Sequence, residues 1–230
     1  MVVWATVDPK AGRAGMKPFV VEAGTPGVRV SKLESKMGIR ASDTASVVLE
    51  DCRLPLDNLL GQAEVGDPTK GFKGAMATFD STRPSVAASA LGIARAALGL
   101  VKELLALSGM EVRYDRPRNL QPAIVRDVID LEAQLRAAWL LTLKAGWLMD
   151  RRLPNTIESS MCKALAPTVA YEAASLGMEL LGAVGGRGDH LIEKLFRDVK
   201  AMDIVEGTGQ IQRIVIARNL VNLPNDTPGA

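Results

Sequence analysis

The sequence predicts a mostly α-helical protein in which a partial β-domain is followed by an antiparallel bundle of the four-helix type. Two observations support this fold class. Short β-rich runs separated by glycine, proline and aspartate fill the first 70 residues, and apolar residues at helical spacing follow from residue 71. Aromatic residues make up only 4% of the chain, so the core must consist mainly of smaller apolar side chains. We expect a β-domain over 1–70, a helical bundle domain over 71–222 and a tail over 223–230.

The first domain contains four runs rich in β-branched residues, each bounded by residues that favour turns. Three adjacent apolar residues, Val47 to Leu49, indicate either a strand buried on both faces or a strand end. The predicted strands are Val2–Val7, Lys17–Glu22, Val28–Leu33 and Thr44–Cys52.

The second domain begins with a helix over Val86–Leu107, which carries few charges and which Pro84 opens from a first-turn position. Arg113–Pro122 form a basic loop, and Asn155 or Thr156 is expected to cap the third helix. Long helices joined by short loops indicate antiparallel packing. The further helices are expected from Pro122 to about Asp150, from Thr156 to about Leu181, over Leu191–Met202 and over Gln210–Leu220, with a glycine-rich loop at Gly182–Gly188.

Charge and composition exclude several classes of function. The formal net charge is +2, which gives no electrostatic reason to expect binding to nucleic acid or to a membrane surface. There is neither a signal peptide nor an apolar run long enough for a transmembrane helix, so we expect a cytoplasmic protein without membrane insertion. His190, Cys52 and Cys162 are too few for a zinc site of the usual kind unless carboxylates join them, and no metal site is predicted.

A glycine-rich segment, Gly182 to Gly188, permits two interpretations. Its backbone N–H groups can cradle a phosphate, or it is only a loop between two helices. It lacks the Lys-Ser/Thr pair of a Walker loop, and a helix precedes it where a Rossmann fingerprint requires a strand. On pattern alone, the interhelix loop is favoured.

Glu206 lies just before the last predicted helix and also permits two interpretations. Its carboxylate stabilises the helix N-terminus through the macrodipole, or it serves as a general base. Ile204 and Val205 are expected to form an apolar wall beside it, which would raise the pKa of the carboxyl group toward neutrality. A structural ion pair with Arg213 is a further alternative. Spacing alone favours a structural role.

Seven motifs in a fixed order change this balance. They lie at Val20 to Val28, Lys36 to Thr44, Asp51 to Pro55, Phe79 to Pro84, Leu181 to Gly185, Glu193 to Asp198 and Glu206 to Arg213. In their order and spacing, the chain resembles the acyl-CoA dehydrogenase family over essentially its whole length. The resemblance implies an FAD-dependent oxidoreductase of fatty acid β-oxidation that desaturates acyl-CoA thioesters between Cα and Cβ.

The resemblance also implies roles for individual residues. Glu206 matches the glutamate that removes the α-proton while the β-hydrogen leaves as hydride to flavin N5, and whose backbone N–H donates to the thioester carbonyl. Asp80, Thr82, Arg83 and Gly207 match the acyl-CoA site, where Thr82 lies beside the glutamate. For Arg83 the alternative is a salt bridge with Asp80 at the start of a helix.

The FAD contacts follow in the same way. Thr208 and Gln210 match residues that touch the cofactor, and Gly182 and Gly185 match a loop near its adenosine end. The family's arginine that reaches the FAD of a neighbouring subunit is assigned to Arg113.

The basic loop leaves this last assignment open, because Arg113, Arg116 and Arg118 are all candidates to meet a phosphate and the family's Phe-Gly pair is missing. The family further implies assembly into a dimer or tetramer through the bundle, as a homo- or hetero-oligomer. An electron-transferring flavoprotein is the expected partner.

The chain departs from the family pattern at Ala183 and Val184, where glycine and asparagine are usual, and at Glu179, where glutamine is usual. The family's N-terminal helical domain and the first half of its β-domain have no counterpart here. We therefore expect the C-terminal portion of an acyl-CoA dehydrogenase, as a fragment or truncated product. The alternative is a non-catalytic assembly subunit that needs a partner chain to bind FAD.

Overall fold

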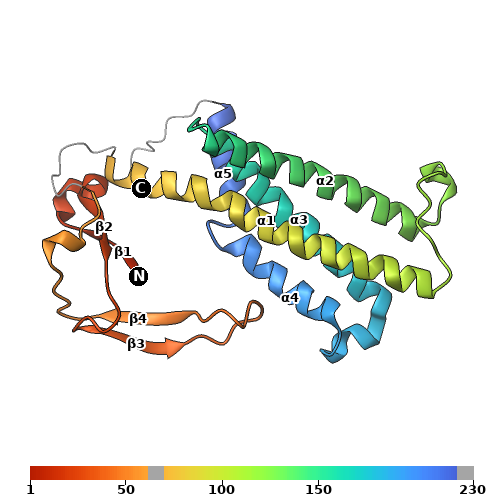
Figure 1. Cartoon of the computed structure of the whole chain (residues 1–230), viewed down its shortest axis with the longest axis horizontal. Helices are drawn as coiled ribbons and strands as arrows, with labels where there is room; N and C mark the ends of the chain where they lie inside the picture. The colour runs from red at the N-terminus through yellow and green to blue at the C-terminus, as the bar shows by residue number, and fades with distance from the viewer. Residues whose placement is uncertain (62–69, 222–230) are drawn as a thin grey trace. The chain divides into compact units, whose positions relative to one another are not determined.

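The computed structural model describes the backbone of residues 1–61 and 70–221, and the side chains of residues 1–61 and 74–221. Within these ranges the chain forms two strand pairs and a set of long helices (Figure 1). It divides into two compact units, Met1–Lys36 with Arg40–Phe79 and Met37–Ile39 with Asp80–Ala230. This division falls inside the first helix, so the predicted boundary at residues 70 and 71 stays a prediction. The predicted tail, 223–230, lies outside the described residues.

The first unit contains two antiparallel strand pairs. β1 (Val2–Thr6) pairs with β2 (Met16–Val20), and β3 (Val28–Leu33) pairs with β4 (Ala45–Leu49). All four predicted strands are present, although three of them end earlier than the apolar runs suggested. The turn residues that follow each run account for this shortening, because they leave the extended conformation before the apolar residues stop.

The prediction that β4 is buried on both faces is wrong. The side chains of Val47 and Leu49 are 37% and 42% exposed. Among the described residues of this unit, β4 pairs with β3 along one edge. The alternative interpretation, a strand end, agrees with the structure because Leu49 is the last residue of β4.

The first helix, α1 (Lys70–Leu107), begins well before the predicted start at Val86, so Pro84 lies inside it. A proline inside a helix leaves the carbonyl four residues earlier without its N–H donor. That carbonyl belongs to Asp80, and it accepts hydrogen bonds from Asn155 Nδ2 at 3.1 Å and from Ser159 Oγ at 2.7 Å. The expected first-turn position of Pro84 is wrong because these two side chains replace the lost backbone donor.

The remaining helices agree with the predicted segments within a few residues. Their bounds are α2 (Ala123–Asp150), α3 (Thr156–Leu181), α4 (Leu191–Ile204) and α5 (Gly209–Leu220), and the glycine-rich segment forms a 3-10 turn, η4 (Gly182–Arg187). None of the described helices is both long and apolar enough to cross a membrane.

The caps of these helices are side chains that the sequence only partly indicated. His190 Nδ1 accepts the Ile192 N–H at the start of α4, which gives the single histidine a structural role. Thr208 Oγ1 accepts a hydrogen bond at the start of α5. Asn155 precedes α3 but makes no capping bond with its side chain, because its amide donates to the carbonyls of Asp80 and Ala145 instead.

The core of the second unit is built around α3, which packs against α2, α4 and α5. Its buried side chains are mostly small and apolar, as the low aromatic content predicted. Gly177 of α3 lies so close to α4 that an added Cβ would lie 2.7 Å from Ile192 Cδ1 and closer still to Ile192 Cγ1. Small residues therefore set the separation of these two helices.

Residues 37–39 dock against α4 and belong to the second unit. Ile39 N–H donates to Asp198 Oδ1 at 2.7 Å, and Arg197 donates to Met37 O at 2.7 Å. Burial raises the pKa of the Asp198 carboxyl, but hydrogen bonds from Lys194 and Ile39 outweigh it and hold that pKa below its ordinary value. The motif at Lys36 to Thr44 thus has a structural use, because its centre is bound by buried Asp198.

Replacing Gly177 by alanine tests the contact between α3 and α4. Ile192 is fully buried, so the added methyl group overpacks the interface, and we expect Gly177→Ala to lower the free energy of unfolding by about 1–2 kcal/mol. Gly92→Ala in α1 is the matched control, since an added Cβ there meets nothing within 4 Å, and it should stabilise by up to about 1 kcal/mol. Denaturant unfolding followed by circular dichroism measures both, and equal changes would contradict the close packing at Gly177.

Candidate functional site

The residues assigned to the site fall into two groups at opposite ends of the second unit (Figure 1). Arg83 and Leu107 lie 24 positions apart on α1, which corresponds to roughly 36 Å at about 1.5 Å per residue. The first group lies near Arg83 and the second lies beyond Leu107. The first group is Asp80, Thr82, Arg83, Glu206, Gly207, Thr208 and Gln210, and the second is Arg113, Gly182 and Gly185.

Glu206 lies in the turn between α4 and α5, which we call the Glu206 turn (residues 203–208). Thr82 Oγ1 of α1 donates a hydrogen bond to Glu206 Oε2 at 2.8 Å, although the two residues are 124 positions apart. Within the described part of the chain, Glu206 Oε1 has no hydrogen-bond partner. The structure therefore brings Thr82 and Glu206 together, and it leaves one carboxylate oxygen able to accept a proton. Arg213 makes no ion pair with Glu206 among the described ion pairs.

The prediction that Ile204 and Val205 form an apolar wall beside this carboxylate is wrong. Ile204 and Val205 are 54% and 44% exposed. The end of α4 and the following turn direct these side chains away from the packed interior, which a pattern of apolar neighbours cannot reveal. Glu206 itself is half-buried.

Arg83 is 5% exposed and binds three groups of the second unit. Its Nη1 pairs with Asp80 Oδ1 at 2.7 Å and lies 3.5 Å from Ser160 Oγ, and its Nε lies 3.5 Å from Glu206 O. The alternative role, a salt bridge with Asp80, is thus present, although inside α1 and not at a helix start. Arg83 also contacts the backbone of the Glu206 turn, so the ion pair and a place beside Glu206 are compatible.

Asp80 connects α1 to the start of α3. Its carboxylate binds Arg83 and accepts a hydrogen bond from Thr156 Oγ1 at 2.5 Å, while its carbonyl is bound by Asn155 and Ser159. Both carboxylate oxygens therefore have protein partners. Asp80 acts on the site through Arg83, and nothing in this arrangement directs it to a ligand.

Lys163 of α3 is a site residue that sequence reasoning missed. It is fully buried, and its Nζ donates to Asp203 O of α4 at 2.7 Å. Burial lowers the pKa of Lys163 to about 8, since the charge of nearby Arg83 adds to the effect and the carboxylates of Asp203 and Glu206 only partly oppose it. The available signal was a lysine inside an otherwise apolar stretch of the most buried helix.

Gln212 of α5 was also missed. Its side chain is fully buried, and Nε2 donates to Glu206 O at 3.0 Å and to Gly207 O at 3.1 Å. Its Oε1 is the single buried side-chain acceptor without a hydrogen bond among the described residues. Gly207 has φ +89° and an added Cβ would lie 2.6 Å from Gln212 Nε2, so only glycine fits beside this amide.

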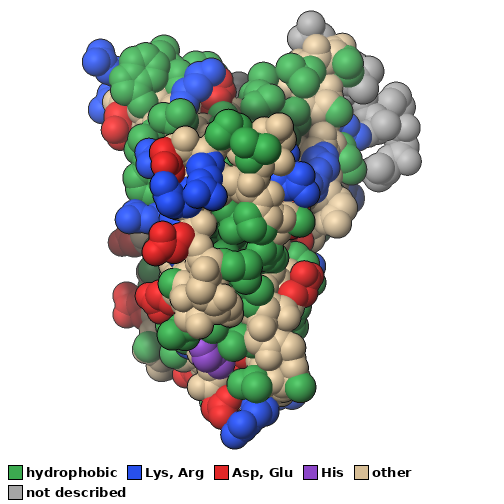
Figure 2. All heavy atoms as spheres, turned by 90° about the vertical axis from the view of Figure 1, so that its right-hand side faces the viewer, with side chains coloured by type: hydrophobic (Ala, Val, Ile, Leu, Met, Phe, Trp, Pro, Cys, Tyr) green, Lys and Arg blue, Asp and Glu red, His purple; other side chains and the backbone are tan. Residues whose placement is uncertain are grey.

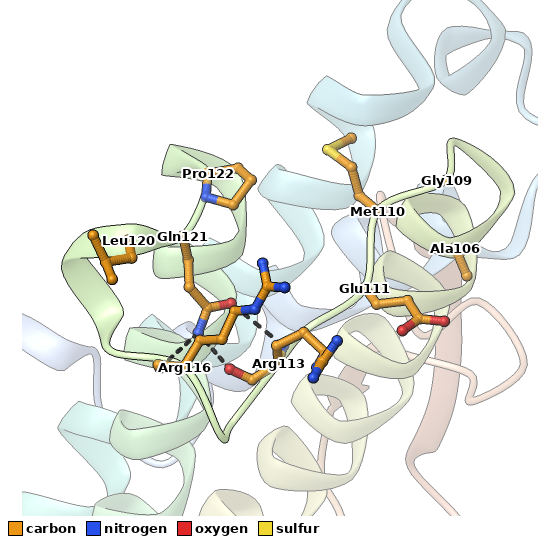
Figure 3. Close-up of a pocket in the computed structure, with 9 residues that line it drawn as sticks. All are labelled: Ala106, Gly109, Met110, Glu111, Arg113, Arg116, Leu120, Gln121 and Pro122. Atoms are coloured by element: carbon orange, nitrogen blue, oxygen red, sulfur yellow. Dashed lines mark hydrogen bonds between the residues drawn. The ribbon is translucent and has the colours of Figure 1, made fainter.

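Of the second group, Arg113 lines a pocket of about 360 Å³ between the end of α1 and the start of α2, whereas Gly182 and Gly185 do not line it. Figure 3 shows Arg113, Arg116 and Gln121 meeting at this pocket, where Gln121 Nε2 donates to the backbone carbonyls of both arginines at 2.5 and 3.3 Å. Figure 2 views this end of the bundle, where Lys and Arg side chains lie beside hydrophobic ones. The backbone of the basic loop is therefore bound by one buried glutamine.

The three arginines of this loop differ in their partners. Arg113 pairs with Asp115 at 2.6 Å, and Arg118 pairs with Asp130. Arg116 has no ion pair within the described residues. Among these three guanidinium groups, the one on Arg116 is therefore the best placed to bind a phosphate of a ligand.

The glycine turn η4 has structural reasons for its glycines. Gly182 N–H donates to the carbonyls that close α3, so this N–H is not available to a phosphate. Gly185 is buried, and an added Cβ would lie 3.1 Å from Leu181 Cβ. These features favour the interpretation of this turn as a loop between helices.

The residues present fit part of an FAD molecule. In the first turn of α5, Thr208 accepts the N–H groups of Ile211 and Gln212, whereas those of Gly209 and Gln210 have no acceptor among the described residues. With the exposed Gln210 side-chain amide, these two N–H groups suit anionic or carbonyl groups. Arg116 offers a guanidinium to a phosphate. Because these places lie at opposite ends of the bundle, a single cofactor molecule does not reach both in one chain.

Comparison with known proteins identifies the class of this fold. Residues 69–221 match the C-terminal domain of acyl-CoA dehydrogenases. Among solved structures, a chain from work on the electron transferring flavoprotein of Acidaminococcus fermentans superposes with a TM-score of 0.84 at 35% identity. The superposition covers 96% of this chain and 56% of the other chain. Butyryl-CoA dehydrogenase from Megasphaera elsdenii superposes with a TM-score of 0.83 at 34% identity, over 96% of this chain and 55% of that one.

The amino-acid sequence agrees with the structural comparison. The chain is 39% identical over 222 residues to the acryloyl-CoA reductase (NADH) of Anaerotignum propionicum, which covers 96% of this chain and 54% of that protein. This chain belongs to the acyl-CoA dehydrogenase family, as its motif order predicted. It spans about half the length of the curated relatives that it matches.

The ion pair between Asp80 and Arg83 predicts a large effect on stability. Asp80→Asn removes the carboxylate that balances a buried guanidinium, so we expect the free energy of unfolding to fall by about 2–4 kcal/mol. Asp130→Asn is the matched control, because its pair with Arg118 is 43% and 54% exposed and should contribute less than about 1 kcal/mol. Equal losses in denaturant unfolding would show that burial does not distinguish the two pairs.

The pKa of Lys163 predicts how stability depends on pH. Between pH 8 and 10.5 the unfolded chain keeps a proton that the folded chain has released, so wild-type stability rises with pH in this window. Lys163→Met has no titrating group at this position, so this rise in stability is absent from it. The wild type should therefore gain about 2–3 kcal/mol relative to Lys163→Met between pH 7 and pH 10, measured by urea unfolding at each pH.

The control for this measurement is Lys144→Met, because Lys144 is an exposed partner of Glu158. Its stability should run parallel to that of the wild type over the same pH range. A parallel course for Lys163→Met would contradict the buried environment of Lys163.

Proposed function

We propose that the complete protein is a flavin-dependent acyl-CoA dehydrogenase in which Glu206 removes the α-proton of an acyl-CoA thioester. The observation that carries this proposal is the 2.8 Å hydrogen bond between Thr82 and Glu206. It holds one carboxylate oxygen in a fixed position and leaves the other to face a substrate. A general base must be oriented in this way before its pKa matters.

The reaction needs the developing negative charge on the thioester to be stabilised, because an α-proton is a weak acid. The backbone N–H of Glu206 has no acceptor among the described residues, so it can donate to the thioester carbonyl. The proton passes to Glu206 Oε1 as the double bond forms between Cα and Cβ. FAD, when bound, supplies the acceptor for the hydride that leaves Cβ. Arg83 and Thr82 keep the Glu206 turn and its carboxylate in place, and Gly207 gives the turn its left-handed backbone.

The cofactor contacts are proposed at both ends of the bundle. Thr208 and Gln210 lie close to Glu206 and are assigned to the FAD that serves this base. Arg116 and Arg113 are assigned to the FAD of a neighbouring chain. Gly182 and Gly185 of η4 are proposed to border its adenosine end without a bond from the Gly182 N–H, which is bound within the chain. The separation of roughly 36 Å along α1 supports this division, and the division in turn requires an oligomer.

The names of the relatives favour a short-chain acyl-CoA as substrate and an electron-transferring flavoprotein as partner. Acryloyl-CoA and butyryl-CoA are thioesters of short acyl groups, and on this basis we propose a short-chain acyl-CoA as substrate. An electron-transferring flavoprotein is the proposed electron acceptor, since one structural relative comes from work on such a protein.

The alternative is a non-catalytic assembly subunit. The departures at Ala183, Val184 and Glu179 favour it, whereas Glu206 and its bond to Thr82 favour the enzyme. Co-expression with a chain that carries the family's N-terminal domains distinguishes the two. A yellow complex that is bleached by butyryl-CoA supports the enzyme, and a complex that never binds flavin supports the assembly subunit.

Replacing Glu206 by glutamine tests the proposed base in that complex. The amide cannot accept the α-proton, so turnover with butyryl-CoA should fall by at least 1,000-fold while flavin binding and butyryl-CoA binding persist. Glu172→Gln is the control, because Glu172 is exposed on α3 and should leave turnover unchanged. Turnover of Glu206→Gln within tenfold of wild type would show that another group is the base.

A further inference from the structure

The Glu206 turn adopts a backbone conformation that it does not favour by itself. Glu206 has φ +59° and Gly207 has φ +89°, so two successive residues occupy the left-handed region. This region is unfavourable for a residue with a Cβ, and such a conformation persists only where surrounding contacts determine it. The direction of the Glu206 side chain follows from this backbone.

Two fully buried donors bind the carbonyls of this turn from different helices. Gln212 Nε2 of α5 binds Glu206 O and Gly207 O, and Lys163 Nζ of α3 binds Asp203 O at 2.7 Å. Asp203 lies in the last turn of α4, where the carbonyls have no partners within the helix and carry the negative end of its dipole. An ammonium group at this place fixes the end of α4, three residues before Glu206.

The stability of the fold does not explain a lysine at this position. Its side chain is fully buried, and burial destabilises the charged form enough to lower the pKa of Lys163 to about 8. Replacing both partners of a buried ion pair by apolar groups of similar volume is often neutral or stabilising, so the burial of a charge is weak evidence for a role in stability. Methionine at position 163 would fill the same space among the apolar residues of α3, but it would leave Asp203 O without its donor.

We propose that Lys163 is a positioning residue, whose bond to Asp203 O fixes the Glu206 turn and thereby the direction of the Glu206 carboxylate. This inference rests on the proposed function, since it treats Glu206 as the base. Lys163 itself touches neither substrate nor cofactor in this proposal. It acts through the backbone of residues 203–208, while Thr82 acts on the carboxylate directly.

The first test measures the turn in the 230-residue chain without any ligand. Backbone ¹⁵N order parameters are measured by NMR for the wild type, Lys163→Met and Lys163→Gln. The glutamine side chain is too short to reach Asp203 O, and it provides a second variant if methionine impairs folding. Lys144→Met, an exposed lysine of α2, is the control.

In the wild type and in Lys144→Met, we expect order parameters of about 0.85 at Glu206 and Gly207, as in rigid backbone. In both Lys163 variants they should fall below about 0.6, while Val169 in the middle of α3 stays rigid and reports that the fold is intact. Rigid values at Glu206 in a folded Lys163 variant would overturn the proposal, because the turn would then be held without the lysine.

The second test uses the flavin-containing complex with butyryl-CoA as substrate. A misdirected base lowers kcat by at least tenfold and leaves KM within twofold, since the substrate contacts are unchanged. A KM increase with unchanged kcat would contradict a positioning role. If the order parameters change as expected but the wild-type complex has no dehydrogenase activity, the proposed function fails while the structural role of Lys163 stands.

Discussion

The second unit depends on how the carbonyl group of Asp80 is satisfied. Pro84 removes the backbone donor that this carbonyl would have in an unbroken helix, and Asn155 and Ser159 replace it. This exchange joins α1 to the start of α3 at the level where the Asp80 side chain also pairs with Arg83. A proline that would otherwise weaken α1 therefore creates the attachment point between the two helices, and it places Thr82 and Arg83 toward the Glu206 turn.

Polar groups are buried in this region although the rest of the core is apolar. Arg83, Lys163 and Gln212 are each less than a tenth exposed, and all three direct donors at the backbone around Glu206. Burying such groups costs solvation energy that small alanine and valine side chains would not cost. These polar groups are buried at one end of the bundle, where side chains from other positions donate hydrogen bonds to the Glu206 turn. The core around Gly177 contains apolar side chains.

The two groups of candidate residues cannot serve one cofactor within a chain, because about a whole helix length separates them. Along α1 the path from Arg83 to Leu107 is roughly 36 Å. The Thr82–Glu206 contact and the pocket beside Arg116 are each held by hydrogen bonds of their own. Their separation supports the proposal that the two ends of the bundle belong to different sites of an oligomer.

The sequence by itself determined the four strands, the later helices and the family, since apolar periodicity and the order of motifs depend on residues close together in the chain. It also singled out Glu206, Thr82 and Arg83. Only the tertiary structure decided that α1 continues through Pro84, because the donors to the Asp80 carbonyl come from residues 75 and 79 positions away. The roles of Lys163 and Gln212, and the exposure of Ile204, were likewise decided by packing between helices, which local sequence patterns do not encode.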